Sequence, residues 1–126
     1  QRRREIARRY SEAFTGVPIT APAAIDNSSY VAHLYVIRSP FRDGLRRELA
    51  NSEITTDVHY PIPDYRQQSV APRLASPPSC PVTEECCRTV LTLPCFPEMT
   101  EQEVEQVIRS VHAASRAGRA ANWQKT

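Results

Sequence analysis

The distribution of prolines constrains this chain more than any other feature of its sequence. The chain has eleven prolines and three glycines among 126 residues. Proline fixes φ and lacks a backbone N–H, so it ends strands and shapes connections. Pro61 and Pro63 directly follow a strand-like segment, and the polar residues 64–80 contain further prolines. We therefore expect short regular elements joined by shaped connections, of which a surface loop over 64–80 is the longest; a loop of that length is usually functional or mobile.

The length and composition indicate one globular domain, which we expect to span residues 1–126. A chain of this length fits one compact domain. The apolar fraction of 40% and the charged fraction of 24% exclude wholesale disorder. No apolar run approaches the ~18 residues that a membrane-spanning helix needs, so we expect no membrane partner. The net charge of +2 is too small to indicate a nucleic-acid partner.

Three helices are predicted before the last one. An apolar stripe with helical spacing predicts an amphipathic helix at the N-terminus; its residues are Ile6, Tyr10, Ala13 and Phe14. Ser39 is a suitable N-cap for a second helix, with Pro40 at the first helical position. Residues 82–88 predict a short third helix.

The last helix has the clearest sequence signals. Thr100 and Glu103 have the spacing of a capping box, in which each residue bonds the backbone N–H of the other. A stripe at i, i+3, i+4 and i+7 follows; it consists of Val104, Val107, Ile108 and Val111. We expect residues 113–126 to form a frayed tail.

Three segments have the composition of strands. Residues 29–38 are apolar on both parities, which predicts a strand covered on both faces. Residues 54–60 alternate apolar and polar side chains, and residues 89–93 predict a further strand. The expected fold is α+β: a small, mainly antiparallel sheet of three strands, or four, packed by helices.

The four cysteines do not have the spacing of a metal site. Cys86 and Cys87 are adjacent, and Cys80 and Cys95 do not complete two Cys-x-x-Cys pairs. The composition is also unlike that of a small disulfide-stapled secreted domain. We therefore expect free thiols and no metal, which favours a reducing cytoplasm.

The three histidines lie in different sequence contexts. His33 falls in the first predicted strand, which favours a core or interface role, and His112 follows an apolar helix position, which favours a solvated or capping role. His59 ends a strand on the polar parity, just before a proline-fixed loop, where scaffolds place binding groups. A ligand contact and a solvated strand end both remain open for His59. The parity of Tyr60 places it on the core side.

Several motifs occur together in one order. They are 33–38 (HLYVIR), 59–63 (HYPIP), 81–84 (PVTE), 91–100 (LTLPCFPEMT) and 103–107 (EVEQV). With this set, the chain from about Arg4 to about Ala113 resembles the C-terminal small domain of the DegT/DnrJ/EryC1/StrS family. Members of that family are pyridoxal-phosphate-dependent aminotransferases that act on nucleotide-activated keto sugars in amino-sugar and polysaccharide biosynthesis.

The resemblance implies a substrate-binding role for three residues of this chain. His59, Tyr60 and Gln67 match positions that contribute to the sugar-nucleotide pocket of the family. Tyr65 departs from the family, because relatives often have histidine there. The resemblance also implies that the longer parent protein is a homodimer, uses pyridoxal phosphate, and takes its amino group from glutamate.

The lysine content limits what this chain can do alone. In the family, a lysine of the large domain binds the cofactor. The sixteen cationic residues here are fifteen arginines and Lys125, close to the C-terminus. We therefore expect no catalytic residue and no bound cofactor in this chain, which starts at Gln1 within a helical pattern and is interpreted as a piece of a longer polypeptide. Two alternatives are a stand-alone binding or regulatory module, and a family member repurposed for sugar dehydration.

Overall fold

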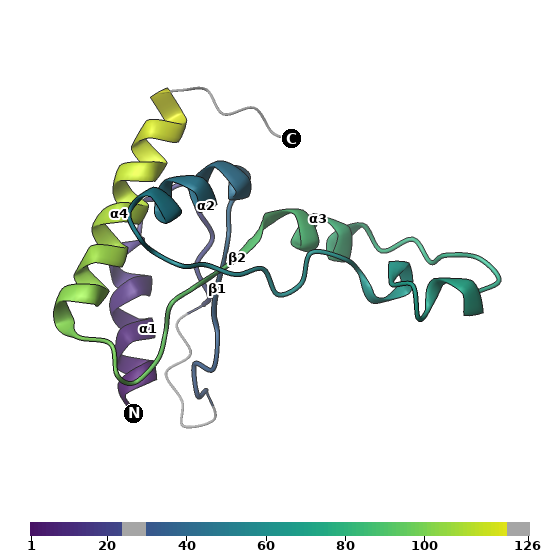
Figure 1. The fold of residues 1–126 in the computed structure, drawn as a ribbon, viewed down its shortest axis with the longest axis horizontal. Coiled ribbons are helices and arrows are strands. Elements are labelled where there is room, and N and C mark those ends of the chain that lie inside the picture. The colour runs from purple at the N-terminus through teal and green to yellow at the C-terminus, as the bar shows by residue number, and fades with distance from the viewer. Residues whose placement is uncertain (24–29, 121–126) are drawn as a thin grey trace.

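The computed structural model describes residues 1–23 and 30–120 (Figure 1). These residues form the helices α1 (Arg2–Ala13), α2 (Arg42–Asn51), α3 (Pro81–Thr89) and α4 (Glu101–Ala120). The strands are β1 (Tyr35–Arg38) and β2 (Val90–Leu93), and two 3-10 turns are η1 (Asp64–Arg66) and η2 (Ala71–Arg73). The α+β class and the predicted helices near 82–88 and after Thr100 are confirmed.

The sheet is narrower than expected. Strands β1 and β2 pair antiparallel, from Tyr35 opposite Leu93 to Arg38 opposite Val90. On the outer side of β1, Thr20 forms a single bridge with Arg38, and on the outer side of β2, Asp57 forms one with Thr92. Within the described residues the sheet therefore has two strands, and the prediction of three or four is not confirmed.

The predicted strand over 54–60 is replaced by this one-residue bridge. The backbone N–H of Ile54 bonds the carbonyl of Leu49 at the end of α2. The N–H of Val58 donates to Oδ1 of Asp57 at 2.7 Å. Apart from the two bonds that Asp57 exchanges with Thr92, no backbone bond between residues 53–60 and β2 is present in the described chain, so the pairing stays a single bridge.

Strand β1 is shorter than the predicted strand over 29–38. Ala32 has φ +49°, in the left-handed region, which interrupts an extended chain. Val31 is 65% exposed, so the continuous apolar run does not correspond to a strand covered on both faces. Residue 29 lies outside the described residues.

The core lies between the sheet and helices α1, α2 and α4. In Figure 1, α1 and α4 lie on the same side of the strands, and α2 packs against α4. Tyr10 of α1 and Tyr35 of β1 are fully buried and meet edge to face at 5.1 Å between ring centroids. Their hydroxyls bond the Pro94 carbonyl and the Ser11 hydroxyl, each at 3.0 Å. Burial raises the pKa of Tyr35 to about 12.

The predicted start of the last helix is confirmed, whereas that of the second helix shifts. The N–H of Thr100 donates to Glu103 Oε2 at 2.7 Å, and the N–H of Glu103 donates to Thr100 Oγ1 at 3.2 Å. The Ser39 hydroxyl accepts from the N–H of Phe41, but α2 begins at Arg42. Ser39 and Pro40 therefore form a turn before the helix.

Helix α4 is longer than expected and is fastened to α1. It continues to Ala120, with Ala114 and Ser115 buried. The prediction of a frayed tail is therefore wrong for residues 113–120. Residues 121–126 lie outside the described residues. Arg2 and Arg9 of α1 both form ion pairs with Glu101.

In the part of the chain that the structure describes, no helix combines the length and the apolarity required to cross a membrane.

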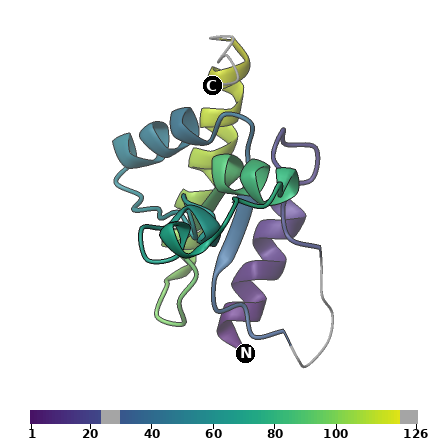
Figure 2. The ribbon, with the colours of Figure 1, turned by 90° about the vertical axis from the view of Figure 1, so that its right-hand side faces the viewer.

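Residues 61–80, which we call the arm, leave the sheet on the side away from α1 and α4 (Figure 1). The arm includes η1 and η2 and leads into α3. Figure 2 views the molecule from the arm's side, with α3 and the arm in front of the strands. Nearly all arm residues are exposed, and Pro63 is buried. The predicted surface loop over 64–80 is confirmed.

Candidate functional site

His59 lies at the base of the arm and is fixed to strand β2. Its Nδ1 is 2.9 Å from the hydroxyl of Thr92. Thr92 is buried, whereas the His59 side chain keeps 23% of its surface exposed. The ring is therefore held from the protein interior and has one edge open to solvent.

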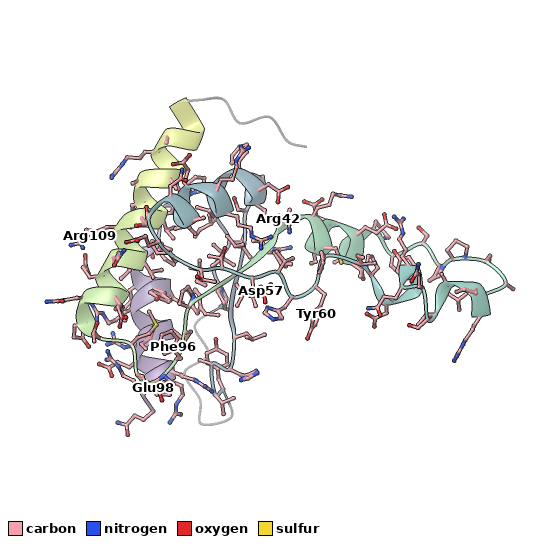
Figure 3. All side chains as sticks on the ribbon, viewed as in Figure 1. Arg42, Asp57, Tyr60, Phe96, Glu98 and Arg109 are labelled. Carbon is pink, nitrogen blue, oxygen red and sulfur yellow. The ribbon has the colours of Figure 1, made fainter. Side chains whose placement is uncertain are left out.

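Asp57 completes a cluster with His59 and Thr92, which we call the His59 cluster. The Thr92 N–H donates to the Asp57 carbonyl at 2.7 Å, and the Asp57 N–H donates to the Thr92 carbonyl at 3.2 Å. The carboxylate Oδ2 of Asp57 lies 3.6 Å from Nε2 of His59, and this side chain is 73% exposed. In Figure 3, Asp57 and Tyr60 mark the point where the arm leaves the body of the domain.

Tyr60 is exposed, which corrects the prediction that it packs in the core. Its residue surface is 68% accessible. The alternation of buried and exposed side chains continues to Val58, which is buried. It fails at Tyr60, because alternate residues face opposite sides only where the chain runs beside a sheet, and the pairing with β2 ends at Asp57. The Tyr60 ring stands edge-on to the His59 ring at 5.3 Å between centroids. Together with Ile62, which is 51% exposed, it forms apolar surface at the base of the arm.

Gln67 lies further along the arm. It follows η1, and its carbonyl accepts from the N–H groups of Val70 and Ala71 at 3.0 and 2.9 Å. Its side chain is exposed. Among the described residues no hydrogen bond joins it to the His59 cluster, whereas the rings of His59 and Tyr60 are in contact.

Glu84 of α3 braces the arm. Its Oε1 accepts hydrogen bonds from the Tyr65 hydroxyl and from Nη2 of Arg66, each at 2.7 Å. The phenol donor, with the Arg66 charge nearby, lowers the pKa of Glu84 below its ordinary value. The same bond to the carboxylate raises the pKa of Tyr65. We call these three residues the arm brace.

Sequence reasoning missed Thr92 and Glu84 as site residues. A signal existed for Thr92, since it is the one polar residue in the apolar run from Val90 to Leu93. Buried polar side chains require a partner, so a threonine in such a strand indicates a nearby polar group. Glu84 belongs to a motif that supported the family resemblance, but nothing in the sequence pairs it with Tyr65.

The other two histidines lie elsewhere. His33 is exposed and precedes β1, so a core role is wrong, because the strand that would bury it does not reach it. An interface role for His33 stays a prediction. Nε2 of His112 is 2.9 Å from the carbonyl of Ala13, at the end of α1. His112 therefore caps α1 from the middle of α4, whereas the prediction concerned the end of its own helix.

The cysteines carry free thiols, and Cys95 is buried. Burial raises the pKa of the Cys95 thiol. Across the ranges 1–23 and 30–120, no group of three His, Cys, Asp or Glu side chains is placed to hold a metal ion.

The described residues do not fit a pyridoxal phosphate site. The cofactor is carried by a lysine amine, and Lys125, the one lysine of the sequence, lies outside the described residues. The His59 cluster offers hydrogen-bonding groups but no amine. We assign no cofactor chemistry to this part of the chain.

Comparison with known proteins gives consistent matches over most of the chain. A dTDP-3-amino-3,6-dideoxy-alpha-D-galactopyranose transaminase from Aneurinibacillus thermoaerophilus is 37% identical over 112 residues, which are 89% of this chain and 30% of that protein. A UDP-N-acetyl-3-dehydro-alpha-D-glucosamine 3-aminotransferase from Acidithiobacillus ferrooxidans is 31% identical over 105 residues, 83% of this chain and 28% of that protein.

The fold also matches solved structures. The crystal structure of DesV from S. venezuelae superposes with a TM-score of 0.83 and 31% identity, covering 90% of this chain and 31% of that one. A DegT DnrJ EryC1 StrS aminotransferase from Brucella abortus gives a TM-score of 0.79 at 29% identity, covering 88% and 30%. The chain thus spans about 30% of the length of these relatives. The sequence profile of the family matches residues 1–112, from α1 into α4, and this chain therefore belongs to the DegT/DnrJ/EryC1/StrS aminotransferase family.

Proposed function

We propose that this chain is the C-terminal small domain of a pyridoxal-phosphate-dependent aminotransferase that aminates a nucleotide-linked keto sugar. The names of the matched relatives support this activity, since both are sugar-nucleotide aminotransferases. Both names also specify the 3-position of the sugar, which favours amination at C-3. The cofactor and its lysine would lie in the part of the polypeptide outside this chain.

The observation that carries the proposal is the His59 cluster at the base of the arm. Its ring is anchored through Nδ1 and exposes its other edge beside the accessible Tyr60 ring. A binding pocket typically combines apolar surface with a few fixed polar groups. His59 would donate a hydrogen bond to an oxygen of the sugar nucleotide, and the Tyr60 ring would pack against the sugar or the base. Gln67 would contact the same ligand from further along the arm.

The finer properties of the parent protein follow from the same family membership. We propose glutamate as the amino donor, a homodimeric assembly, a role in amino-sugar and polysaccharide biosynthesis, and a cytoplasmic location. The free thiols of Cys80, Cys86, Cys87 and Cys95 suit a reducing compartment. The 126-residue chain alone would be inactive.

The test separates the two half-reactions in the complete polypeptide that contains this chain. His59→Ala should lower kcat/KM for the sugar nucleotide by roughly 5–150-fold, the equivalent of one lost hydrogen bond of ~1–3 kcal/mol in a buried site. Single-turnover release of 2-oxoglutarate from glutamate should be unchanged, because that half-reaction does not involve the sugar. Gln102→Ala is the control, since Gln102 is exposed on α4, away from the arm.

Two results would contradict the proposal. Equal losses in both half-reactions would mean that His59 has a structural role. A parent protein that converts the sugar nucleotide without transferring nitrogen would identify the sugar-dehydrating alternative.

A further inference from the structure

Thr92 occupies an unusual place in the sheet. It is the polar residue of β2, it is 7% exposed, and it pairs with Val36 of β1 on one side and with Asp57 on the other. Its hydroxyl lies 2.9 Å from Nδ1 of His59, which is its hydrogen-bond partner within the described part of the chain. A buried hydroxyl needs such a partner, because it has lost water on burial.

The direction of this hydrogen bond follows from what each group can do. A neutral imidazole has one N–H donor and one bare nitrogen, and a hydroxyl has one hydrogen to donate. If Nδ1 carried the proton, the Thr92 hydrogen would be left in a buried position with no acceptor among the described residues. If the hydroxyl donates to Nδ1, both groups are satisfied, and the ring proton lies on Nε2.

Asp57 favours the same arrangement. Its Oδ2 is 3.6 Å from Nε2 of His59. A protonated Nε2 faces this carboxylate favourably, whereas a bare lone pair there would face a negative charge. The separation exceeds that of a normal hydrogen bond, so the Nε2–H remains available to a ligand.

We propose that Thr92 is a positioning residue that holds neutral His59 in the Nε2–H form and aims this donor out of the base of the arm. The identity of the acceptor, an oxygen of the sugar nucleotide, rests on the function proposed above. The fixing of the tautomer by Thr92 does not depend on that function.

The direct test is NMR of the complete polypeptide labelled with ¹⁵N in its histidine rings, at about pH 8.5, where an ordinary imidazole is neutral. A protonated ring nitrogen and a bare one have well-separated ¹⁵N shifts, and His59→Gln identifies the His59 signals. We expect a protonated Nε2 and a bare Nδ1. A protonated Nδ1 in the unmodified protein would overturn the proposal without any variant.

Two variants separate the role of the hydroxyl from that of the methyl group. Thr92→Val removes it and keeps a β-branched residue in the strand, and it should leave His59 as a mixture of both tautomers. Thr92→Ser keeps the hydroxyl and should retain the Nε2–H form. An unchanged tautomer in Thr92→Val, with a far-UV spectrum like that of the unmodified protein, would also overturn the proposal.

Kinetics distinguish this proposal from the proposed function. Thr92→Val should lower kcat/KM for the sugar nucleotide about 2- to 10-fold, mainly through KM. Release of 2-oxoglutarate from glutamate should be unchanged. Thr92→Ser should keep the kcat/KM of the unmodified protein. A tautomer change without any kinetic change would support the role of Thr92 and count against His59 as a substrate contact.

Discussion

The helix-and-sheet body of the domain and the arm are stabilised in different ways. In the body, large apolar side chains from distant parts of the sequence are fully buried, such as Ile6, Leu49 and Leu91. The arm buries little and is held by polar contacts at two places, the His59 cluster at its base and the arm brace on α3. The body therefore derives its stability from burial, whereas the conformation of the arm depends on a few hydrogen bonds.

The largest difference should appear when one leucine is truncated in each region. Leu91→Ala, in β2, should lower the free energy of unfolding by about 2–5 kcal/mol, because it removes a fully buried side chain. Leu74→Ala, on the arm, should change it by less than about 0.5 kcal/mol, since Leu74 is 38% exposed. Urea unfolding followed by far-UV circular dichroism measures both. Similar losses would mean that the arm is part of the folding unit.

A smaller, local effect should follow from breaking the arm brace. Glu84→Gln removes the charge that Tyr65 and Arg66 share, and the arm should open more often while the urea midpoint stays the same. Limited trypsin digestion reports this opening, since cleavage after Arg66 and Arg73 should become several-fold faster. The control is Glu85→Gln, because Glu85 pairs with Arg88 within α3 and not with the arm. Equal digestion rates in both variants would rule out a bracing role for Glu84.

The smallest effect should be the pH dependence of the same brace. The pKa of Glu84 is lowered in the folded chain. Glu84 therefore stabilises the arm fully above its ordinary pKa of 4.5, and this stabilisation is lost as the pH falls through the lowered pKa. The pKa of Tyr65 is raised. Tyr65 therefore stabilises the arm fully below its ordinary pKa of 10.0, and this stabilisation is lost as the pH rises through the raised pKa.

The amides of Arg66 and Gln67 donate to the carbonyls of Pro63 and Asp64, and their exchange across the pH range, corrected for the intrinsic rate, measures this dependence. Protection should decrease at both extremes, and in Glu84→Gln it should not respond to pH in the acidic range. A protection profile that is flat below pH 4.5 in the unmodified chain would contradict the assignment.

The sequence predicted local patterns better than contacts between distant segments, because the two depend on different kinds of information. The stripe of Ile6 and Tyr10 and the capping box of Thr100 are local patterns, and the structure contains them where they were expected. The segment 54–60 has an equally good alternation, but a strand also needs a partner with several free donors and acceptors. Asp57 forms the single bridge there, which alternation alone could not reveal.

The candidate site was also predictable only where a local pattern of the sequence indicates it. His59 could be singled out from its place before two prolines, and the structure holds it at the base of the arm. Tyr60 was assigned to the wrong face, because parity was extended past the last residue that pairs with the sheet. Thr92 is 33 residues away from His59 along the chain, so no local pattern in the sequence relates the two residues.

The double attachment of Asp57 and His59 to one strand residue has a consequence for how such a domain can diversify. Because Thr92 fixes both through backbone and hydroxyl bonds, the position of His59 does not depend on the length or composition of the chain beyond the brace. Surface loops tolerate insertions and substitutions far better than sheets. Residues 68–79 therefore form a natural region for recombination or library design, in which the contacts of the arm can be altered while the histidine donor keeps its place.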